Sequence, residues 1–83
     1  MDNKERLHIL EAVKWAQEHP QQIMYMSNES ENKEEFMAEL MNQYGFDEVQ
    51  AIVIIDIRAR AFTKKEKEKV NNEIQEILGK INN

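Results

Sequence analysis

Residues 44–81 read YGFDEVQAIVIIDIRARAFTKKEKEKVNNEIQEILGKI, and this stretch decides the fold. Its apolar run AIVIIDI, residues 51–57, is ambiguous, because Val and Ile favour strands and the run could be a buried strand. Helix is favoured because Asp47 and Gln50 have the spacing of an N-terminal cap and the segment runs without a break to Arg60. No second strand is available to pair with it. We therefore predict a helix near residues 48–60 that is buried on more than one side.

A final helix is expected after Thr63. Thr63 and Glu66 have the spacing of a capping box, the clearest in the chain, which predicts a helix near residues 64–81. Its apolar side chains follow one another at intervals of 4, 3 and 4 residues, the spacing of a coiled-coil seam of less than two heptads. These side chains are Val70, Ile74, Ile77 and Ile81.

The beginning of the chain carries another amphipathic pattern. A helix is predicted near residues 3–18, and it should end near His19 because Pro20 disfavours helical geometry at the residue before it. Trp15 lies off the apolar stripe of this helix and is expected to mark a second contact surface. The stripe itself repeats at intervals of three and consists of Leu7, Leu10, Val13 and Ala16.

The middle of the chain supplies two more elements and a loop. Residues 23–26 are apolar and are expected to form about two turns of helix, whereas residues 27–32 are polar and are expected to be a loop. A helix is predicted near residues 33–44, and Gly45 stands where a left-handed terminator belongs. The predicted fold class is all-α. The methionines of this region are expected to fill the core rather than to line a binding groove: Met24, Met26, Met37 and Met41.

The composition excludes several classes of function. The 83 residues suit a single domain, 1–83, and they hold 11 Lys plus Arg against 16 Asp plus Glu, a net charge of −5. Nucleic-acid-binding domains usually carry a basic excess, so no direct binding of nucleic acid is expected. There is no cysteine for a disulfide or a thiolate metal site. Without a signal peptide or an apolar run of the roughly 20 residues that a membrane span requires, we expect a cytoplasmic protein.

Few side chains suggest chemistry. His8 and Glu11 have a metal-ligand-like spacing, but no further ligand converges on them, so we expect a solvent-exposed pair and neither metal nor cofactor. His19 is expected to cap a helix end. The sequence contains no Gly-rich phosphate loop and no Ser-His-Asp arrangement.

Two charged residues, Asp56 and Arg58, interrupt the apolar helix. A charge at such a position needs a partner, because burying it unpaired costs several kcal/mol. Asp56 can reach Arg60 four residues on, and a local salt bridge at the helix end is expected. The alternative is a group on a second protein chain.

Residues 44–81 resemble the A subunit of DNA gyrase and topoisomerase IV, near the end of its coiled-coil arm. The family pattern there is approximately F-x-L-S-E-x-Q-A-x-A-I-L-D-M-R-L-x-x-L-T-x-x-E-x-E-K-I. This chain departs from it at Ile52, where the family has a polar residue, and at Val53, where the family has Ala. Near the N-terminus, Arg6, His8, Ile9, Leu10 and Glu11 resemble the family's R-A-H-I-L-E-G. The matching positions in the main stretch are Phe46, Glu48, Gln50, Ala51, Ile54, Asp56, Arg58, Thr63, Glu66, Glu68 and Lys69.

The resemblance implies a small helical bundle on a short antiparallel coiled-coil stub. In the family, two long helices form an arm, and the bundle at its far end pairs with its twin across a two-fold axis as the exit gate for the transported duplex. The seam of the stub would be formed by Leu7, Leu10 and Val13 on the leaving helix and by Val70, Ile74, Ile77 and Ile81 on the returning helix. The family's catalytic tyrosine lies in another domain, and Tyr25 and Tyr44 match no catalytic motif, so the chain is not expected to be an enzyme.

These features leave three functional interpretations open. The first is a non-catalytic homodimerisation or interaction module built like the exit gate. The second is a regulator or inhibitor that pairs with the A subunit of a resident gyrase or topoisomerase IV, since a two-fold interface is self-complementary. The third is a truncated gene remnant, or an excised piece, with no independent role.

The expected dimer interface lies on the helix that follows Asp47. Ala51, Ile54 and Ile55 match the family's apolar positions and should face the bundle core. The opposite side should be covered by a second copy or by the loop near residues 27–32. The expected interface residues are Val49, Ile52, Val53 and Asp56, and the expected helix caps are Asp47, Thr63 and Glu66.

Overall fold

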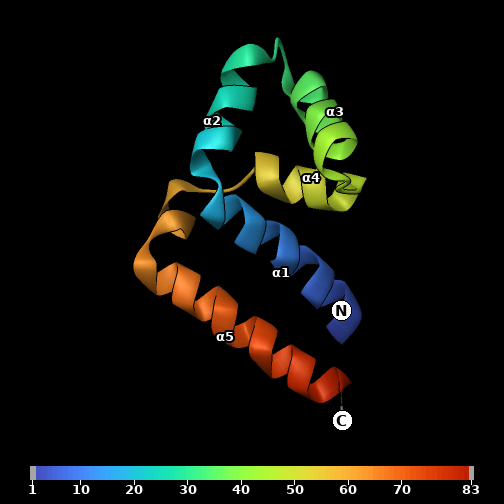
Figure 1. Ribbon diagram of the computed structural model, residues 1–83, viewed down its shortest axis with the longest axis vertical. Coiled ribbons are helices and arrows are strands. Elements are labelled where there is room, and N and C mark those ends of the chain that lie inside the picture. Colours follow the sequence, from blue (N-terminus) through green and yellow to red (C-terminus); the bar gives the residue numbers. More distant parts are fainter. Residues whose placement is uncertain (1, 83) are drawn as a thin grey trace.

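The computed structural model describes residues 2–82, and that part of the chain is helical throughout, without a strand. Its elements are α1 (Asn3–Glu18), α2 (Pro20–Glu29), α3 (Lys33–Tyr44), α4 (Glu48–Ile55), the 3-10 helix η1 (Ala59–Phe62) and α5 (Lys64–Ile81). Helices α1 and α5 lie side by side and antiparallel, and α2, α3 and α4 form a triangle on the other side of α1 (Figure 1). The all-α prediction is confirmed, and the ambiguous run is helical through Ile55.

Side-chain caps begin four of the five α-helices. In each, the capping oxygen accepts a hydrogen bond from the backbone N–H three residues on, and the capping residues are Asp2, Asn32, Asp47 and Thr63. Asp47 and Gln50 also form the reciprocal bond, which completes a capping box. Thr63 accepts from Glu66 at 3.4 Å, but the Glu66 carboxylate lies 3.6 Å from Lys69 Nζ instead of returning to Thr63. The capping box predicted at Thr63 is therefore only half formed.

We expect Thr63→Ala to lower the free energy of unfolding by about 0.5 kcal/mol, the low end of the range for N-cap substitutions. The cap is a single long bond at an exposed helix end. Asp47→Ala should lower the melting temperature further, because it removes a shorter cap and a contact with His8. Thermal melts followed by far-ultraviolet circular dichroism measure both variants, and a larger loss at Thr63 than at Asp47 would contradict the two cap geometries.

Helix α4 is shorter than its sequence pattern predicted. It ends at Ile55, and Asp56 is its C-terminal cap residue rather than an interruption of a longer helix. The Ile57 N–H donates to the Ile54 carbonyl at 3.3 Å, which tightens the last turn. The backbone is extended at Arg58 and then forms η1. The prediction of a helix to residue 60 was wrong because the chain must turn here to bring α5 back along α1.

The loop between α2 and α3 is also shorter than predicted. Ser27 and Asn28 are helical, and the loop occupies residues 30–32. Ser30 closes the last turn of α2, because its hydroxyl donates to the Met26 carbonyl at 2.7 Å. Glu31 is held from the other side, since its N–H donates to the Glu35 carboxylate at 2.9 Å. Residues 27–29, which were expected in the loop, are therefore helical, and two local hydrogen bonds hold the short loop that remains.

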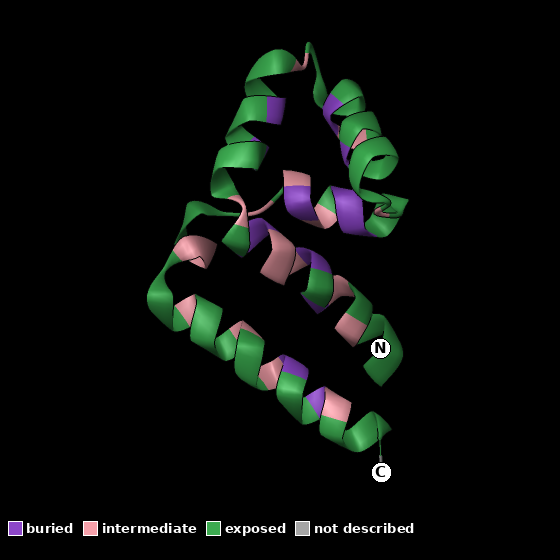
Figure 2. Cartoon of the chain, viewed as in Figure 1, coloured by how far each residue is buried: buried purple, intermediate pink, exposed green. Residues whose placement is uncertain are grey.

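A bundle core joins α1 to α2, α3 and α4. We use that name for the buried cluster that Figure 2 shows on their facing sides. At its centre Leu40 and Ile54 are fully buried. Helices α1 and α4 approach each other with small side chains between them, since Ala12, Ala16 and Ala51 all have 0% exposure. The members of the bundle core are Ala12, Ala16, Ile23, Met26, Phe36, Leu40, Ala51 and Ile54.

The seam between α1 and α5 is a second, smaller cluster. Leu10, Ile74 and Ile77 are its buried members, and Leu7, Val70 and Leu78 pack against them. Five of the seven predicted seam residues therefore come together. Val13 is half-buried outside this cluster, and Ile81, in the last turn of α5, is 38% exposed. Ala16 packs in the bundle core instead of continuing the stripe.

Candidate interaction surface

Helix α4 has one buried and one open face. Ala51 and Ile54 are fully buried, and Ile55 packs against the bundle core. On the opposite side, Val49 is 54% and Ile52 is 45% exposed. We call Val49, Ile52, Val53 and Asp56 the open α4 face; their spacing of three and four residues places them on one side of the helix.

Two members of the open α4 face, Val49 and Ile52, stay exposed among residues 2–82. Val53 is half-buried and Asp56 is exposed. The loop between α2 and α3, which was the alternative cover, lies at the far tip of the triangle, away from α4 (Figure 1). The four residues predicted for the interface therefore share one side of α4, which is open to solvent at all of them except Val53.

A shallow hollow continues this surface toward α1. It has a volume of about 470 Å³ and shares Val49 with the open α4 face. Ile9 contributes a further half-buried aliphatic side chain to its wall. The complete lining is Lys4, Glu5, His8, Ile9, Asp47 and Val49. A partner seated on α4 would therefore find apolar side chains from two helices.

The N-terminus of α4 is tied to α1 by its capping box. Gln50 is buried, and its Nε2 donates to the His8 carbonyl at 2.9 Å while its Oε1 accepts from the Asp47 N–H at 3.2 Å. The second carboxylate oxygen of Asp47 pairs with Nε2 of His8. His8 and Glu11 are both exposed, as expected, but the partner of His8 is the cap of another helix. Spacing along α1 could not reveal a contact between residues 39 apart.

Two carboxylates have depressed pKa values for identifiable reasons. The backbone N–H of Gln50 hydrogen-bonds to Asp47 and, with the His8 ring, lowers the pKa of this carboxyl. The Arg6 guanidinium lowers the pKa of Glu73 through two hydrogen bonds, of 2.7 and 3.1 Å, that join α1 to α5. This second pair was not predicted, because its residues lie 67 positions apart. It is solvent-exposed, so it contributes only about 0.2–1 kcal/mol.

These pKa shifts predict acid sensitivity. A carboxyl whose pKa is lower in the folded chain stabilises the fold above its unfolded pKa of about 4, and loses that contribution as the pH falls through the folded pKa. We expect the melting temperature to fall between about pH 5 and pH 2, and to fall less steeply in Asp47→Asn/Glu73→Gln. Melts across this range measure the slope. Equal slopes for the variant and the unaltered chain would show that neither carboxyl is coupled to folding.

The predictions for His19 and Asp56 have different outcomes, and one buried polar side chain, Gln17, was not predicted. His19 does cap a helix end, because its Nδ1 lies 2.7 Å from the Trp15 carbonyl oxygen. Asp56 forms none of the ion pairs found among residues 2–82, so the predicted bridge to Arg60 was wrong. Gln17 was missed: it is buried and donates to the Ala61 carbonyl at 2.8 Å, which fixes η1 against α1.

Trp15 forms the second packing surface of α1 that its position predicted. Its ring stacks on His19 with a centroid distance of 4.7 Å, and it lies 4.7 Å from Tyr44 and 5.1 Å from Phe46. This aromatic group closes the angle between α1 and the end of α3. Phe46, which follows the left-handed Gly45 (φ +73°), packs in this way against the bundle core.

The chain is more extended than a typical monomer of its size. Its radius of gyration is 13.4 Å, against about 11.8 Å expected for 83 residues. Its accessible surface is 5972 Å², against about 5200 Å² for a compact monomer of this mass.

None of the helices in the described residues is both long enough and apolar enough to cross a membrane.

The sequence has clear relatives. The family of the DNA gyrase and topoisomerase IV A subunits matches residues 1–83. The chain is 36% identical over 78 residues to the DNA gyrase A subunit of Staphylococcus aureus (strain MRSA252) and 33% identical over 76 residues to that of Clostridium acetobutylicum. These matches cover 94% and 92% of this chain but only 9% of each relative. Because the match extends over the whole length of the chain, the protein belongs to the family of DNA gyrase and topoisomerase IV A subunits.

Proposed function

We propose that this chain is a non-catalytic interaction module in which two copies pair through the open α4 face. The observation that carries the proposal is the exposure of Val49 and Ile52 on a helix whose opposite side buries Ala51 and Ile54 completely. Fully burying one Val or Ile is worth about 1.5–3 kcal/mol, and both side chains are close to half exposed in the single chain. A second copy that covers these side chains would recover the part of this burial free energy that the single chain does not gain.

The sequence departs from its family pattern in the direction that this proposal requires. Ile52 stands where the family has a polar residue, and Val53 stands where it has alanine. Both changes add apolar surface to the open α4 face and none to the bundle core. A two-fold contact uses the same patch on both partners, so a single apolar face is sufficient to build it.

The rest of the fold serves as a support in this proposal. Helices α1 and α5 would be the ends of the arm, held together by the coiled-coil seam and by the Arg6–Glu73 pair. The bundle core would hold α4 rigidly at the tip. DNA cleavage and transport are properties that we do not assign to this piece.

Capture of an untagged copy by a tagged copy tests self-pairing. The two purified forms are mixed, and we expect the tagged form to retain the untagged one at micromolar concentration. Sedimentation equilibrium of the untagged chain should give twice the mass of one chain. A single-chain mass at every concentration, together with no capture, would contradict the proposal.

A second candidate function is regulation of a full-length gyrase A subunit. The motivating observation is that relatives with the same segment are far longer, since the chain spans about 9% of their length. A copy of one half of a self-complementary contact can compete for the other half. Adding the chain to a purified gyrase A subunit should then yield a mixed complex in native mass spectrometry, and its absence at excess chain would exclude this function.

A further inference from the structure

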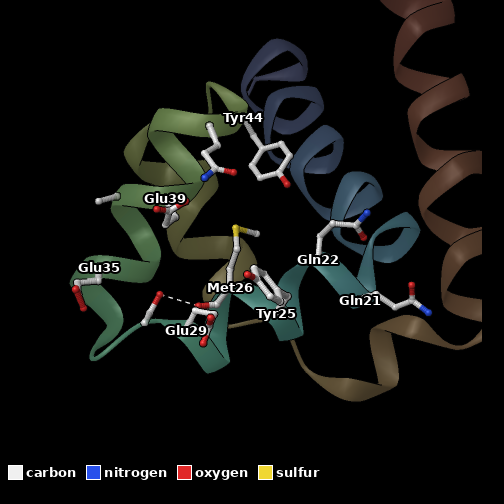
Figure 3. A pocket seen from close by; sticks show the side chains of 11 residues that line it. Gln21, Gln22, Tyr25, Met26, Glu29, Glu35, Glu39 and Tyr44 are labelled. Atoms are coloured by element: carbon white, nitrogen blue, oxygen red, sulfur yellow. Dashed lines mark hydrogen bonds between the residues drawn. The ribbon is translucent and has the colours of Figure 1, made fainter.

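A groove opens between α2 and α3, on the side of the triangle away from α5. Its volume is about 740 Å³. Tyr25 and Met26 reach into it from α2, and Tyr44 and Glu39 reach into it from α3 (Figure 3). Tyr25 is 67% and Tyr44 is 40% exposed. Two tyrosine rings thus stand at the edge of a groove whose floor is a buried methionine.

The rim of the groove is acidic. Glu29, Glu35 and Glu39 line it, and none of the ion pairs among residues 2–82 includes any of them. Residues 20–45 contain five glutamates and one lysine, a net charge of −4, so this hairpin carries most of the chain's net −5. The groove therefore combines carboxylates that are outside these ion pairs with two partly exposed tyrosine rings, of which Tyr44 also packs on Trp15.

We propose that this groove binds an arginine-bearing amphipathic segment of another protein. A guanidinium can stack on a tyrosine ring and at the same time donate paired hydrogen bonds to a carboxylate, whereas a lysine ammonium does both less well. The apolar face of such a segment would pack on the rings of Tyr25 and Tyr44. Met24 and Met41, which are 59% and 37% exposed, do not line the groove. These methionines were expected in the core, and their exposure corrects that prediction.

The groove lies apart from the open α4 face. It is formed by α2 and α3, and none of its lining residues belongs to α4. Two surfaces of different chemistry thus lie on different sides of the triangle, one apolar and one acidic with aromatic edges. The proposal concerns a partner beyond self-pairing, and it stands or falls separately from the proposed function.

Fluorescence anisotropy with a labelled peptide tests the proposal. The probe is an amphipathic peptide of about 14 residues with arginines on one face and leucines on the other, and lysine and glutamate versions serve as comparisons. We expect the arginine peptide to bind at low salt and the lysine peptide to bind about tenfold more weakly. Ile52→Glu should leave this binding unchanged, which separates it from self-pairing.

Variants of the groove locate the binding. Glu29→Gln/Glu39→Gln should weaken binding of the arginine peptide at least about tenfold, since charge-assisted hydrogen bonds to the guanidinium are lost. Glu11→Gln/Glu68→Gln removes the same charge from exposed carboxylates elsewhere and should change binding less than about twofold. Tyr25→Ala should weaken binding, whereas Tyr25→Phe, which keeps the ring, should not. Circular dichroism shows that each variant is folded.

Several results would overturn the proposal. Equal losses of peptide affinity in Glu29→Gln/Glu39→Gln and in Glu11→Gln/Glu68→Gln would mean that the peptide responds only to net charge. Equal binding of the lysine peptide, or displacement by spermidine, would mean that the groove merely attracts cations. If the chain self-associates, and both Arg58→Gln/Arg60→Gln and Glu29→Gln/Glu39→Gln abolish this self-association, the occupant of the groove is a second copy. The absence of measurable binding by the arginine peptide would also reject it.

Discussion

Ile54→Ala is expected to lower the free energy of unfolding by about 2–5 kcal/mol, the range for a buried isoleucine cut back to alanine. Ile54 has 0% exposure and belongs to the bundle core that joins α4 to α1, α2 and α3. A domain of 83 residues has a total stability of only about 4–12 kcal/mol. The variant should therefore lose a large part of the stability of the chain.

Urea denaturation followed by circular dichroism measures the effect. Ile81→Ala is the matched control, because it makes the same change at a position that is 38% exposed in the last turn of α5. It should cost less than about 0.5 kcal/mol. Equal losses at the two positions would mean that Ile54 does not lie in a packed core.

Ile52→Glu is expected to abolish self-pairing and leave a folded monomer. Ile52 lies on the same helix as Ile54, but 45% of it is exposed. A glutamate there can reach water in the single chain, whereas in the pair it would be buried without a cation, at a cost of several kcal/mol. The dissociation constant should rise more than about a hundredfold, while the helical signal remains.

The control for Ile52→Glu adds the same charge at another exposed apolar residue. Met24 is 59% exposed on α2, outside the open α4 face. Met24→Glu should therefore remain paired. If both variants dissociate, net charge controls pairing, and if Ile52→Glu unfolds the chain, Ile52 belongs to the core of the single chain.

Helix starts in this chain are predictable because their signals are local. A cap side chain and the N–H that it accepts from lie three residues apart, and the caps at Asp2, Asn32, Asp47 and Thr63 all form. Gly45 ends α3 in the left-handed conformation for the same kind of local reason. Because these signals act over one helical turn, the order of the helices can be derived without knowing how they pack.

Helix ends and partners across the fold are a different matter. Helix α4 ends at Ile55 because the chain turns there to return α5 to α1. No residue near Asp56 has a sequence signal that predicts this helix end. The His8–Asp47 and Arg6–Glu73 pairs join helices that are remote in sequence. The prediction that Met24 and Met41 fill the core was also wrong. Periodicity shows which residues share a helix face, but it does not show which face packs against another helix.

The open α4 face was predictable in its residues but not in its exposure. A spacing of three and four places Val49, Ile52 and Val53 on one side of the helix. Whether the chain itself covers that side depends on where the α2–α3 loop lies, and the structure places this loop at the opposite tip (Figure 1). The exposure of Ile52 could therefore be established only from the fold.

In the proposed pair, two copies of the chain meet at α4. Isotope-filtered NMR on a mixture of labelled and unlabelled chains tests it most directly, because only contacts between copies give a signal. We expect cross-peaks between copies from the methyl groups of Val49, Ile52 and Val53, and none from Met24. Cross-peaks from Met24 or Tyr25 without any from α4, or no cross-peaks at concentrations where the chain is paired, would contradict it.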